Sequence, residues 1–399
     1  MGGGPAGSYT AWQLAKKGRL VTVLEEHQKI GEPSHCAGHL SIKSLKNLGL
    51  YSLSSGIIEN NFSTANFYSP NGTKFAVKLN EPVTCAINRT LFDEYLATQA
   101  KSFGAKYLLS TRAQGLLLDG KKIKGVTYRK NENVDLKAKM VIDAEGISSR
   151  FVKQAGLNPF GTRGLVYAAE AELENVEGLD EHAVDVYTGS LYAPGFYGWL
   201  IPRPKGKAKL GLAIKRGNPE KFLNHLIKKH PVASKELQNA KLTRITYHTI
   251  TLGGLIDKLQ TDNFLVVGDA ASQVKPTTGG GVIFSLICGG IAANVANQAI
   301  DKGDFSSEYL SYYQKRVQDR LGFDIKVMLK IRNFLNSLSD QKIDDAFRFA
   351  NRVGLLESLR DVDEIDFQGR TILNLLKKPS VYAIIPYLFV LYFSANFKM

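Results

Sequence analysis

The first residues of the chain carry glycines at a spacing that suits phosphate binding. Written as G-x-G-x-x-G, the motif uses Gly2, Gly4 and Gly7, includes Ala6, and is followed by Glu25 at the end of a predicted strand. Glycines at this spacing let backbone N–H groups approach a pyrophosphate at a helix N-terminus. The acidic residue after the next strand then binds ribose hydroxyls. The pattern therefore predicts a dinucleotide site.

The elements around this motif are those of a dinucleotide-binding fold, with one exception. Residues 8–17 predict a helix and residues 21–25 predict the following strand. The strand that should precede the glycines is missing, because Met1 stands where its last residue belongs. From the sequence we expect either a fragment or a natural start that lies upstream.

Two later segments have the chemistry to complete such a site. Residues 141–150 predict a strand that ends in Asp143 and a glycine turn. Residues 264–267 predict a strand that delivers Asp269 to a ribityl hydroxyl or a pyrophosphate. The glycine run that ends at Gly281 then lets the backbone approach a flat ring and opens a helix whose positive end faces it. For Asp143, a purely structural role in a turn and helix cap is the alternative.

The order and spacing of these three segments resemble the FAD-binding pattern of the aromatic-hydroxylase-like flavoproteins, over about the first 300 residues. The resemblance implies that FAD is the cofactor. It places Asp269 near the ribityl-phosphate region, and Gly281 and Val282 near the isoalloxazine. It also implies that Arg89 contacts the FAD phosphates and that the backbone of Ala113 meets the adenine.

Two further segments are similar to one branch of that superfamily, the geranylgeranyl reductase family. Residues 33–38 resemble its cysteine-bearing loop, which implies that Cys36, Ala37 and Gly38 reach the flavin edge. Residues 194–202 resemble its Y-x-W-x-F-P signature, although Ile201 replaces the usual Phe and so puts the pocket shape in question. The resemblance is strongest to the archaeal digeranylgeranylglycerophospholipid reductases, which use FAD to saturate the isoprenoid chains of membrane ether lipids.

The chemistry implied by this resemblance needs a hydride donor, a proton source and a dry apolar slot, because an isoprenoid double bond is unactivated. Tyr197 and Trp199 alternate on a predicted strand and would line such a slot; aromatic packing inside a sheet is the alternative. Cys36 would position the substrate or donate a proton; an inert buried thiol is the alternative. Cys288 is a weaker candidate to face the flavin. The residues do not choose between Cys36, Tyr197 and water as the proton donor.

Composition limits the class of protein. The chain has 399 residues, 44% of them hydrophobic, enough for a large core and for two or three domains. Its three cysteines form no C-x-x-C, which argues against a disulfide framework or a metal site and for a reducing compartment. The first residues are not those of a signal peptide, so we expect a cytoplasmic protein.

The net charge of +14 suits an anionic membrane, an acidic protein partner or nucleic acid, and scattered solvated lysines are the alternative. No nucleic-acid-binding motif is present, so nucleic acid is not expected as a partner. A second nucleotide-binding unit is also lacking. An external electron donor is therefore expected, either a reduced nicotinamide or deazaflavin cofactor or an acidic ferredoxin, which the charge favours.

The predicted fold is α/β: a Rossmann-like FAD-binding domain with an inserted antiparallel β-sheet substrate domain and a C-terminal helical region. The predicted boundaries are 1–60, 85–155 and 255–300 for the FAD-binding domain, 61–84 and 156–254 for the sheet, and 301–399 for the helices. Residues 379–396 form an uncharged apolar tail. Interfacial or substrate contact, a core helix and a membrane span are the alternatives for it. With the basic surface, it leads us to expect peripheral attachment to the inner membrane face.

Local patterns predict the elements inside these domains. Alternating residues predict hairpins over 65–80 and 116–128, apolar spacing predicts a helix over 89–103, and residues 139–144 predict a buried strand. Residues 280–299 predict a helix rich in small residues that packs closely on a flat partner.

Three other functions remain open at this point. A flavin monooxygenase would share the FAD motifs but use oxygen. A quinone-linked electron-transfer flavoprotein dehydrogenase would need an iron–sulfur cluster, and three dispersed cysteines cannot supply the usual four thiolates. A cofactor-free binding protein would result if the missing first strand weakened the FAD site.

Overall fold

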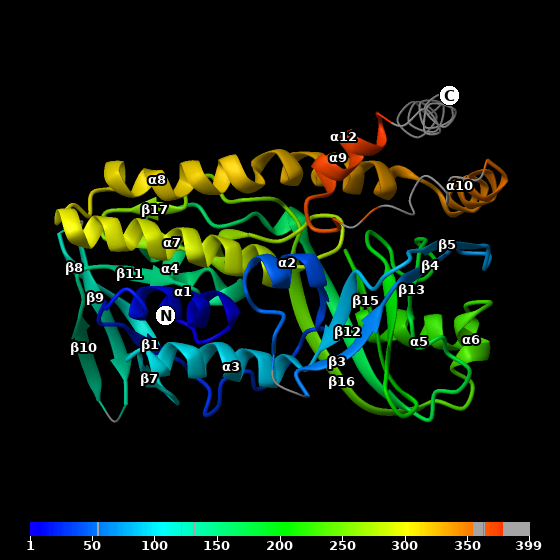
Figure 1. Cartoon of the computed structure of the whole chain (residues 1–399), viewed down its shortest axis with the longest axis horizontal. Helices are drawn as coiled ribbons and strands as arrows, with labels where there is room; N and C mark the ends of the chain where they lie inside the picture. The colour runs from blue at the N-terminus through cyan, green and yellow to red at the C-terminus, as the bar shows by residue number, and fades with distance from the viewer. Residues whose placement is uncertain (54–55, 121, 131, 354–361, 363, 378–399) are drawn as a thin grey trace. The chain divides into compact units, whose positions relative to one another are not determined.

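The computed structural model describes residues 1–53, 56–120, 122–130, 132–353, 362 and 364–377 (Figure 1). The chain divides into two compact units. Unit 1 consists of Met1–Ser34, Arg89–Gly164 and Thr251–Lys326, and unit 2 consists of His35–Asn88, Leu165–Ile250 and Val327–Met399. Each unit is thus assembled from segments that are far apart in the sequence.

Short parallel strands form the centre of unit 1. β1 (Thr22–Leu24) pairs in parallel with β7 (Lys106–Leu108), and β11 (Val141–Asp143) pairs in parallel with β18 (Phe264–Val266). β17 (Gln260–Thr261) joins β18 in the antiparallel direction. The first residues of the chain bond to both parallel pairs: the Gly2 N–H donates to the Leu24 carbonyl at 2.8 Å, and the Met1 carbonyl accepts from the Ala144 N–H at 2.8 Å. The Rossmann-like core expected from the sequence is confirmed.

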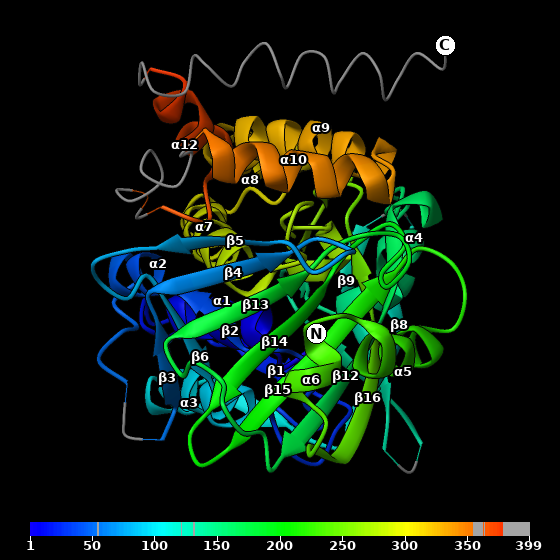
Figure 2. The same cartoon turned by 90° about the vertical axis from the view of Figure 1, so that its right-hand side faces the viewer.

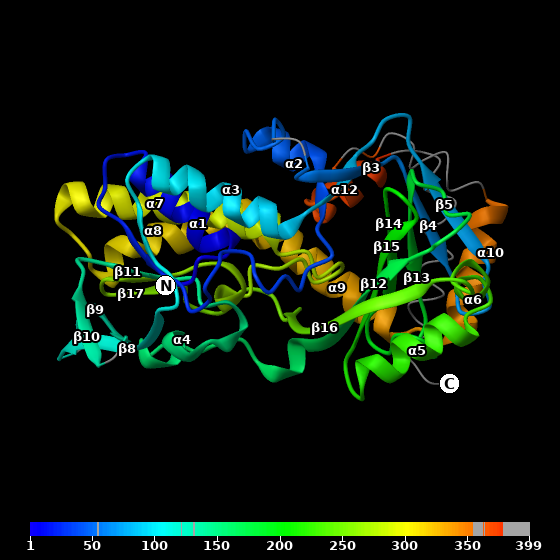
Figure 3. The same cartoon turned by 90° about the horizontal axis from the view of Figure 1, so that it is seen from below.

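Helices pack tightly around α1 in unit 1. α1 (Pro5–Ala15) contacts both α3 (Arg89–Ser102) and α7 (Val282–Lys302), as Figures 1 and 3 show. A Cβ atom on Gly289 of α7 would lie 2.6 Å from Oγ1 of Thr10, so glycine is required for this approach. The small residues predicted in α7 therefore serve contact with another helix.

The other elements of unit 1 are a hairpin sheet and shorter helices. β8 (Arg112–Asp119), β9 (Lys122–Arg129) and β10 (Asn133–Lys137) form an antiparallel sheet, which confirms the predicted hairpin. α4 (Arg150–Gln154) follows β11 in the chain, and α8 (Ser307–Val317) lies beside α7 (Figure 1).

One helix of the described residues is long and apolar enough to cross a membrane. It is α7, with a mean hydropathy of 1.5 in its most apolar window, and 61% of that window is buried inside the protein. This burial fits a core helix of unit 1.

A large mixed sheet forms the centre of unit 2 (Figure 2). Its strands lie in the order β16 (Lys241–Thr251), β12 (Leu165–Glu174), β15 (Lys207–Ile214), β14 (Gly198–Arg203), β13 (Ala183–Tyr187), β4 (Thr64–Tyr68) and β5 (Lys74–Lys78). The pairs from β12 to β13 are antiparallel, as expected, and so is the predicted hairpin of β4 and β5. The β13–β4 pair, however, is parallel. β4 comes from a distant chain segment, so no tight hairpin forces it to run antiparallel to β13.

A smaller sheet and three helices complete this part of unit 2. β2 (His39–Ser41), β6 (Thr84–Ile87) and β3 (Ile58–Phe62) form an antiparallel sheet in the order β2-β6-β3. The helices are α2 (Ile42–Asn47), α5 (Pro219–Lys229) and α6 (Ala233–Glu236). The side chain of Asn218 accepts from the N–H groups of Glu220 and Lys221, so it caps α5 in the usual way.

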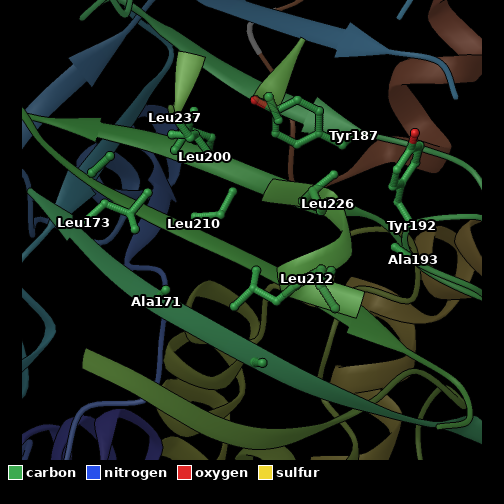
Figure 4. Close-up of a cluster of buried hydrophobic side chains, with 14 of the residues drawn as sticks. Ala171, Leu173, Tyr187, Tyr192, Ala193, Leu200, Leu210, Leu212, Leu226 and Leu237 are labelled. Carbon is green, nitrogen blue, oxygen red and sulfur yellow. The ribbon is translucent and has the colours of Figure 1, made fainter. Parts of the chain in front are cut away.

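The core of unit 2 lies between the large sheet and α5. Leu200, Leu210 and Leu212 come from neighbouring strands and gather with Leu226 of α5, as Figure 4 shows. Tyr187 closes the cluster, and it stacks on Tyr68 with ring centres 5.5 Å apart. This packing fixes the positions of β14 and β15, which carry the aromatic motif and its neighbours.

In the part of the C-terminal region that the structure describes, most residues are helical, as expected. A π-helical turn over Gln318–Gly322 leads into α9 (Phe323–Ser337), which is followed by α10 (Asp340–Arg352) and α12 (Gln368–Leu375). Arg332 of α9 packs on aromatic residues of unit 2. The apolar tail predicted over 379–396 lies outside the described residues.

The compact units and the predicted domains differ in their boundaries. Residues 35–60 were placed in the FAD-binding domain from the sequence, whereas they lie in unit 2. Unit 1 also continues through α8 to Lys326. The reason is tertiary: β2 and β3 pair with β6, so the loop that holds Cys36 is tied to the same unit as β6.

Candidate active site

The glycine motif of unit 1 forms the start of α1, whose N-cap is Gly4. No side chain caps this end and no acidic residue lies in its first turn. The backbone N–H groups at the start of the helix can therefore donate hydrogen bonds to a bound anion. A Cβ atom on Gly4 would meet nothing within 4 Å, so the space in front of the helix is open. A Cβ atom on Gly7, by contrast, would lie 2.0 Å from the Gly2 carbonyl oxygen. The two glycines therefore serve different purposes, ligand approach and backbone packing.

Glu25 follows β1 and turns back onto the glycine loop. Its Oε2 accepts from the Gly3 N–H at 2.7 Å, and its Oε1 lies 2.6 Å from Nδ1 of His27. The carboxylate thus stands beside the start of α1, where the ribose of a dinucleotide is expected. The sequence pattern did not foresee the contact with His27.

Arg89 and Asp269 lie close enough for the charge of Arg89 to affect the pKa of Asp269. The Arg89 guanidinium donates to both carboxylate oxygens of Asp93, at 3.1 and 2.9 Å. Burial raises the pKa of Asp269, and the positive charge of Arg89 acts in the opposite direction. The residues predicted to meet the phosphates and the ribityl chain therefore lie near enough to interact.

The second glycine run begins α7. Gly281 is the N-cap, again without a side-chain cap, and Val282 is the first helical residue. A Cβ atom on Gly281 would lie 3.0 Å from Oδ1 of Asp269, so the two residues are packed together. Lys275 lies against this loop, since a Cβ atom on Gly280 would be 2.7 Å from its Cε atom.

Four other candidates of unit 1 lie in packed or hydrogen-bonded settings. Ala113 of β8 is buried, and its carbonyl accepts from Arg150. Asp143 accepts from the Glu145 N–H at 3.0 Å, which supports the turn-forming alternative. Ala6 packs against the turn after β18: a Cβ atom added to Gly268 would lie 2.9 Å from the Cβ atom of Ala6. Cys288 lies buried inside α7, and burial raises the pKa of its thiol.

The cysteine loop belongs to unit 2. Cys36 is partly exposed, and its sulfur accepts from the Gly38 N–H at 3.5 Å. The Gly38 carbonyl accepts from the Ile87 N–H at 2.8 Å, which fixes the end of the loop on β6. Ala37 lies between these two anchored residues. The neighbouring His39 contacts Oγ1 of Thr84 at 2.7 Å.

Tyr197 and Trp199 also lie in unit 2, with their rings 5.9 Å apart. Tyr197 stacks on Phe196, and the guanidinium of Arg332 lies 4.5 Å from the centre of the Phe196 ring. Burial raises the pKa of Tyr197 to about 12, although the charge of Arg332 lowers it. Burial has the opposite effect on the Arg332 guanidinium, whose pKa it lowers to about 10, because the charged form of arginine is the protonated one.

The structure connects the cysteine loop and Trp199 through two residues that the sequence analysis missed. Glu170 of β12 and Lys209 of β15 form a buried ion pair at 3.3 Å. The Trp199 indole N–H donates to Glu170 at 3.2 Å, and Lys209 Nζ donates to the Cys36 carbonyl at 2.6 Å. The strands also carry Glu172, Glu174 and Lys207, so no signal in the sequence singled out Glu170 and Lys209.

Residues 1–285 match the FAD-binding domain family. A digeranylgeranylglycerophospholipid reductase of Methanocaldococcus jannaschii is 34% identical over 96% of this chain and 95% of its own length. A second such reductase, from Methanopyrus kandleri, is 32% identical over 96% of both chains.

The chain belongs to the digeranylgeranylglycerophospholipid reductase family. Among solved structures, a geranylgeranyl bacteriochlorophyll reductase-like protein of Thermoplasma acidophilum matches with a TM-score of 0.84 and 26% identity, over 96% of this chain and 97% of that one. A flavin-dependent brominase matches with a TM-score of 0.71 and 18% identity, over 97% of both chains, which shows a shared fold. The family resemblance, the fold class and the FAD cofactor predicted from the sequence are confirmed.

The residues of unit 1 fit FAD. The uncapped starts of α1 and α7 can hold its phosphates and its ring, and the open space at Gly4 admits the ligand. Glu25 stands where the ribose is expected, and Arg89 supplies a positive charge. The protein is thus an FAD-dependent oxidoreductase. The glycine motifs, Glu25, Arg89 and Asp269 lie in unit 1, whereas the cysteine loop, Tyr197 and Trp199 lie in unit 2.

Proposed function

We propose that this reductase saturates the C=C bonds of geranylgeranyl chains in membrane lipids or their precursors. The observation that carries the proposal is the strip of aromatic side chains at Phe196, Tyr197 and Trp199, in the same unit as the partly exposed Cys36. Aromatic and apolar walls suit a long hydrocarbon chain. The names of the related archaeal reductases agree with this substrate class.

Saturating a double bond requires a hydride on one carbon and a proton on the other. Reduced FAD supplies the hydride when it is bound. Tyr197 is protonated at neutral pH because its pKa is about 12, so it keeps an O–H group to donate. Cys36 is the second candidate donor, and the donor that is used regains its proton from water. Burial of the aromatic strip keeps other water away from the alkene.

The electron donor is part of the same proposal. Reduction of FAD needs an external reductant, and a net charge of +14 favours an acidic ferredoxin over a reduced nicotinamide or deazaflavin cofactor. For an acidic ferredoxin, raising the salt concentration slows FAD reduction, because salt screens the attraction between the two proteins. A rate that does not depend on salt would remove the argument from charge.

The location of the protein in the cell is also proposed from its net positive charge. We expect it on the inner, cytoplasmic face of the membrane, where anionic lipids attract a basic surface. The test is sedimentation with vesicles of phosphatidylglycerol and, as a control, of phosphatidylcholine. Binding to the anionic vesicles alone supports the proposal, and no binding to either contradicts it.

The reaction itself is tested with dithionite-reduced, FAD-loaded protein and a geranylgeranyl phospholipid. The expected product gains two hydrogen atoms for each reduced bond, as measured by mass spectrometry, and the oxidised protein without dithionite serves as the control. Unchanged lipid after full reduction of the FAD contradicts the proposal. Rapid oxygen consumption with an aromatic substrate would instead favour a monooxygenase.

A further inference from the structure

One row of residues crosses three neighbouring strands of unit 2. In the registers of these strands, Glu170 of β12 lies opposite Gly211 of β15, and Gly211 lies opposite Trp199 of β14. Because residues that face one another across a sheet project from the same side, Glu170 and Trp199 stand on the same side with a glycine between them. The row explains how an indole and a carboxylate two strands apart come into contact.

Gly211 makes that contact possible. A Cβ atom at this position would lie 2.4 to 2.7 Å from three atoms of the Trp199 indole, including Nε1. The indole therefore lies across β15 in the space that a side chain would fill. It reaches Oε2 of Glu170, to which it donates at 3.2 Å.

Lys209 carries the connection to the cysteine loop. Its Nζ lies 3.3 Å from Oε1 of Glu170 and donates to the Cys36 carbonyl at 2.6 Å. Both side chains of the ion pair are at most 5% exposed. Each carboxylate oxygen of Glu170 thus has a partner, one in the indole and one in the ammonium group.

A buried ion pair is an expensive way to stabilise a sheet, because the desolvation of both charges offsets most of their attraction. Apolar residues of similar volume would serve the fold equally well. This pair, however, bonds to the two candidate site segments of unit 2. The hydrogen bonds to the Trp199 indole and to the Cys36 carbonyl therefore explain why a charged pair is buried here.

We propose that Glu170 and Lys209 are positioning residues, which fix the Trp199 indole and the backbone of the Cys36 loop relative to one another. The proposal rests on the proposed function, since it takes Cys36 and Trp199 as substrate-facing residues. Glu170 sets the plane of the indole, and Lys209 holds the loop through the Cys36 carbonyl. Neither residue needs to touch the lipid.

Two reporters are already present in the chain. Cys36 is the partly exposed thiol among three cysteines, and Cys85 and Cys288 are buried, so an alkylating reagent reports on the Cys36 loop. The chain has two tryptophans, Trp12 and Trp199, so a Trp12→Phe background isolates the emission of Trp199. Both signals are read on FAD-loaded protein without lipid, so they do not depend on lipid turnover.

The test variant is Glu170→Gln/Lys209→Met, which removes both charges and leaves no buried charge unpaired. We expect Cys36 to be alkylated at least about fivefold faster, because a hydrogen bond from a charged group to the loop is lost. We also expect the Trp199 emission to shift. The matched control is Glu174→Gln/Lys207→Met, since this exposed ion pair joins the same two strands at 3.1 Å. The control variant should change neither signal.

An alkylation rate and a Trp199 emission equal to those of the control would overturn the proposal. If the double variant does not fold, the single variant Glu170→Gln tests the proposal. This substitution keeps the side-chain volume, but it weakens the hydrogen bond from the Trp199 indole and removes the charge attraction for Lys209. Unchanged Trp199 emission and Cys36 alkylation in that variant overturn the proposal as well. Altered signals in a protein that reduces no geranylgeranyl lipid would refute the proposed function and leave the positioning role standing.

Discussion

The guanidinium of Arg332 lies 5.9 Å from the centre of the Tyr197 ring, on a helix more than a hundred residues further along the chain. It also lies over Phe196, at 4.5 Å. The C-terminal region thus provides a buried cation beside the aromatic motif of unit 2. That charge opposes the effect of burial on the Tyr197 hydroxyl.

Replacing this cation should weaken Tyr197 as a proton donor. In Arg332→Met the pKa of Tyr197 rises further, because the opposing charge is gone. If Tyr197 supplies the proton, kcat for lipid reduction falls, by about tenfold at most for each unit by which that pKa rises. The measurement is single-turnover reduction of a geranylgeranyl lipid.

The control for this prediction is Lys330→Met, an exposed residue on the same helix, which should leave kcat unchanged. Tyr197→Phe and Tyr197→Phe/Arg332→Met should be equally slow. A further loss in the double variant would mean that Arg332 acts on something other than the Tyr197 proton.

Gly4 and Gly7 should respond differently to the same added methyl group. In Gly4→Ala the added methyl group points into open space, and the φ of −68° at this position is ordinary for alanine. The stability of the apoprotein should therefore change by at most about 1 kcal/mol. FAD affinity should fall about tenfold or more, because the methyl group keeps the pyrophosphate from the backbone. Thermal unfolding of the apoprotein and FAD titration measure the two effects.

Gly7→Ala should lower both quantities. Its Cβ atom would lie 2.0 Å from the Gly2 carbonyl oxygen, so the backbone of the loop must move, at a cost of about 1–3 kcal/mol. Equal FAD affinities in the Gly4→Ala variant and the unmodified protein would show that the phosphates do not bind at the start of α1.

Arg89 should have both a structural and a cofactor-binding role. Its ion pair with Asp93 is buried, with side chains 11% and 7% exposed. Arg89→Met leaves the Asp93 carboxylate without its partner and should destabilise the protein by about 3 kcal/mol. Arg89→Met/Asp93→Asn should recover most of that loss, as measured by urea unfolding.

FAD affinity separates the two roles. It should remain low in the Arg89→Met/Asp93→Asn variant, because the positive charge for the phosphates is still missing. Recovery of FAD affinity together with stability would mean that Arg89 is structural alone.

Asp185 should make the protein less stable as the pH rises. Burial raises its pKa to about 7 from an ordinary 3.8, while Asn66, which donates to it at 2.8 Å, acts in the opposite direction. The folded protein therefore holds this proton more tightly than the unfolded chain does. The corresponding stability is present below about pH 4 and is lost as the pH rises through about 7.

Asp185→Asn removes this titration and keeps the shape of the side chain. We expect the variant to exceed the unmodified protein in unfolding free energy by about 1–3 kcal/mol at pH 8, and by less at pH 5. The measurement is urea unfolding at both pH values, with exposed Asp119→Asn as the control. A gain that is the same at pH 5 and pH 8 would rule out the buried carboxyl as its source.

Patterns within a short stretch of chain were sufficient to predict many elements. The helix after the glycines, the hairpin of β4 and β5 and the hairpin of β8 and β9 all follow from local spacing and turn residues. Helix α5 was not predicted, although Asn218 and Pro219 are a recognisable start signal for a helix. The sheet β2-β6-β3 was not predicted either, because its strands are short and come from distant segments.

The sequence by itself determined the cofactor class and the family, because glycine spacing, Glu25 and the strand before Asp269 are local requirements of FAD binding that can be recognised without coordinates. Only the tertiary structure decided what surrounds the candidate catalytic residues of unit 2. The Glu170–Lys209 pair and Arg332 reach Trp199, Cys36 and Tyr197 across strands and from a distant helix. Such contacts depend on strand register and helix packing, which no local pattern encodes.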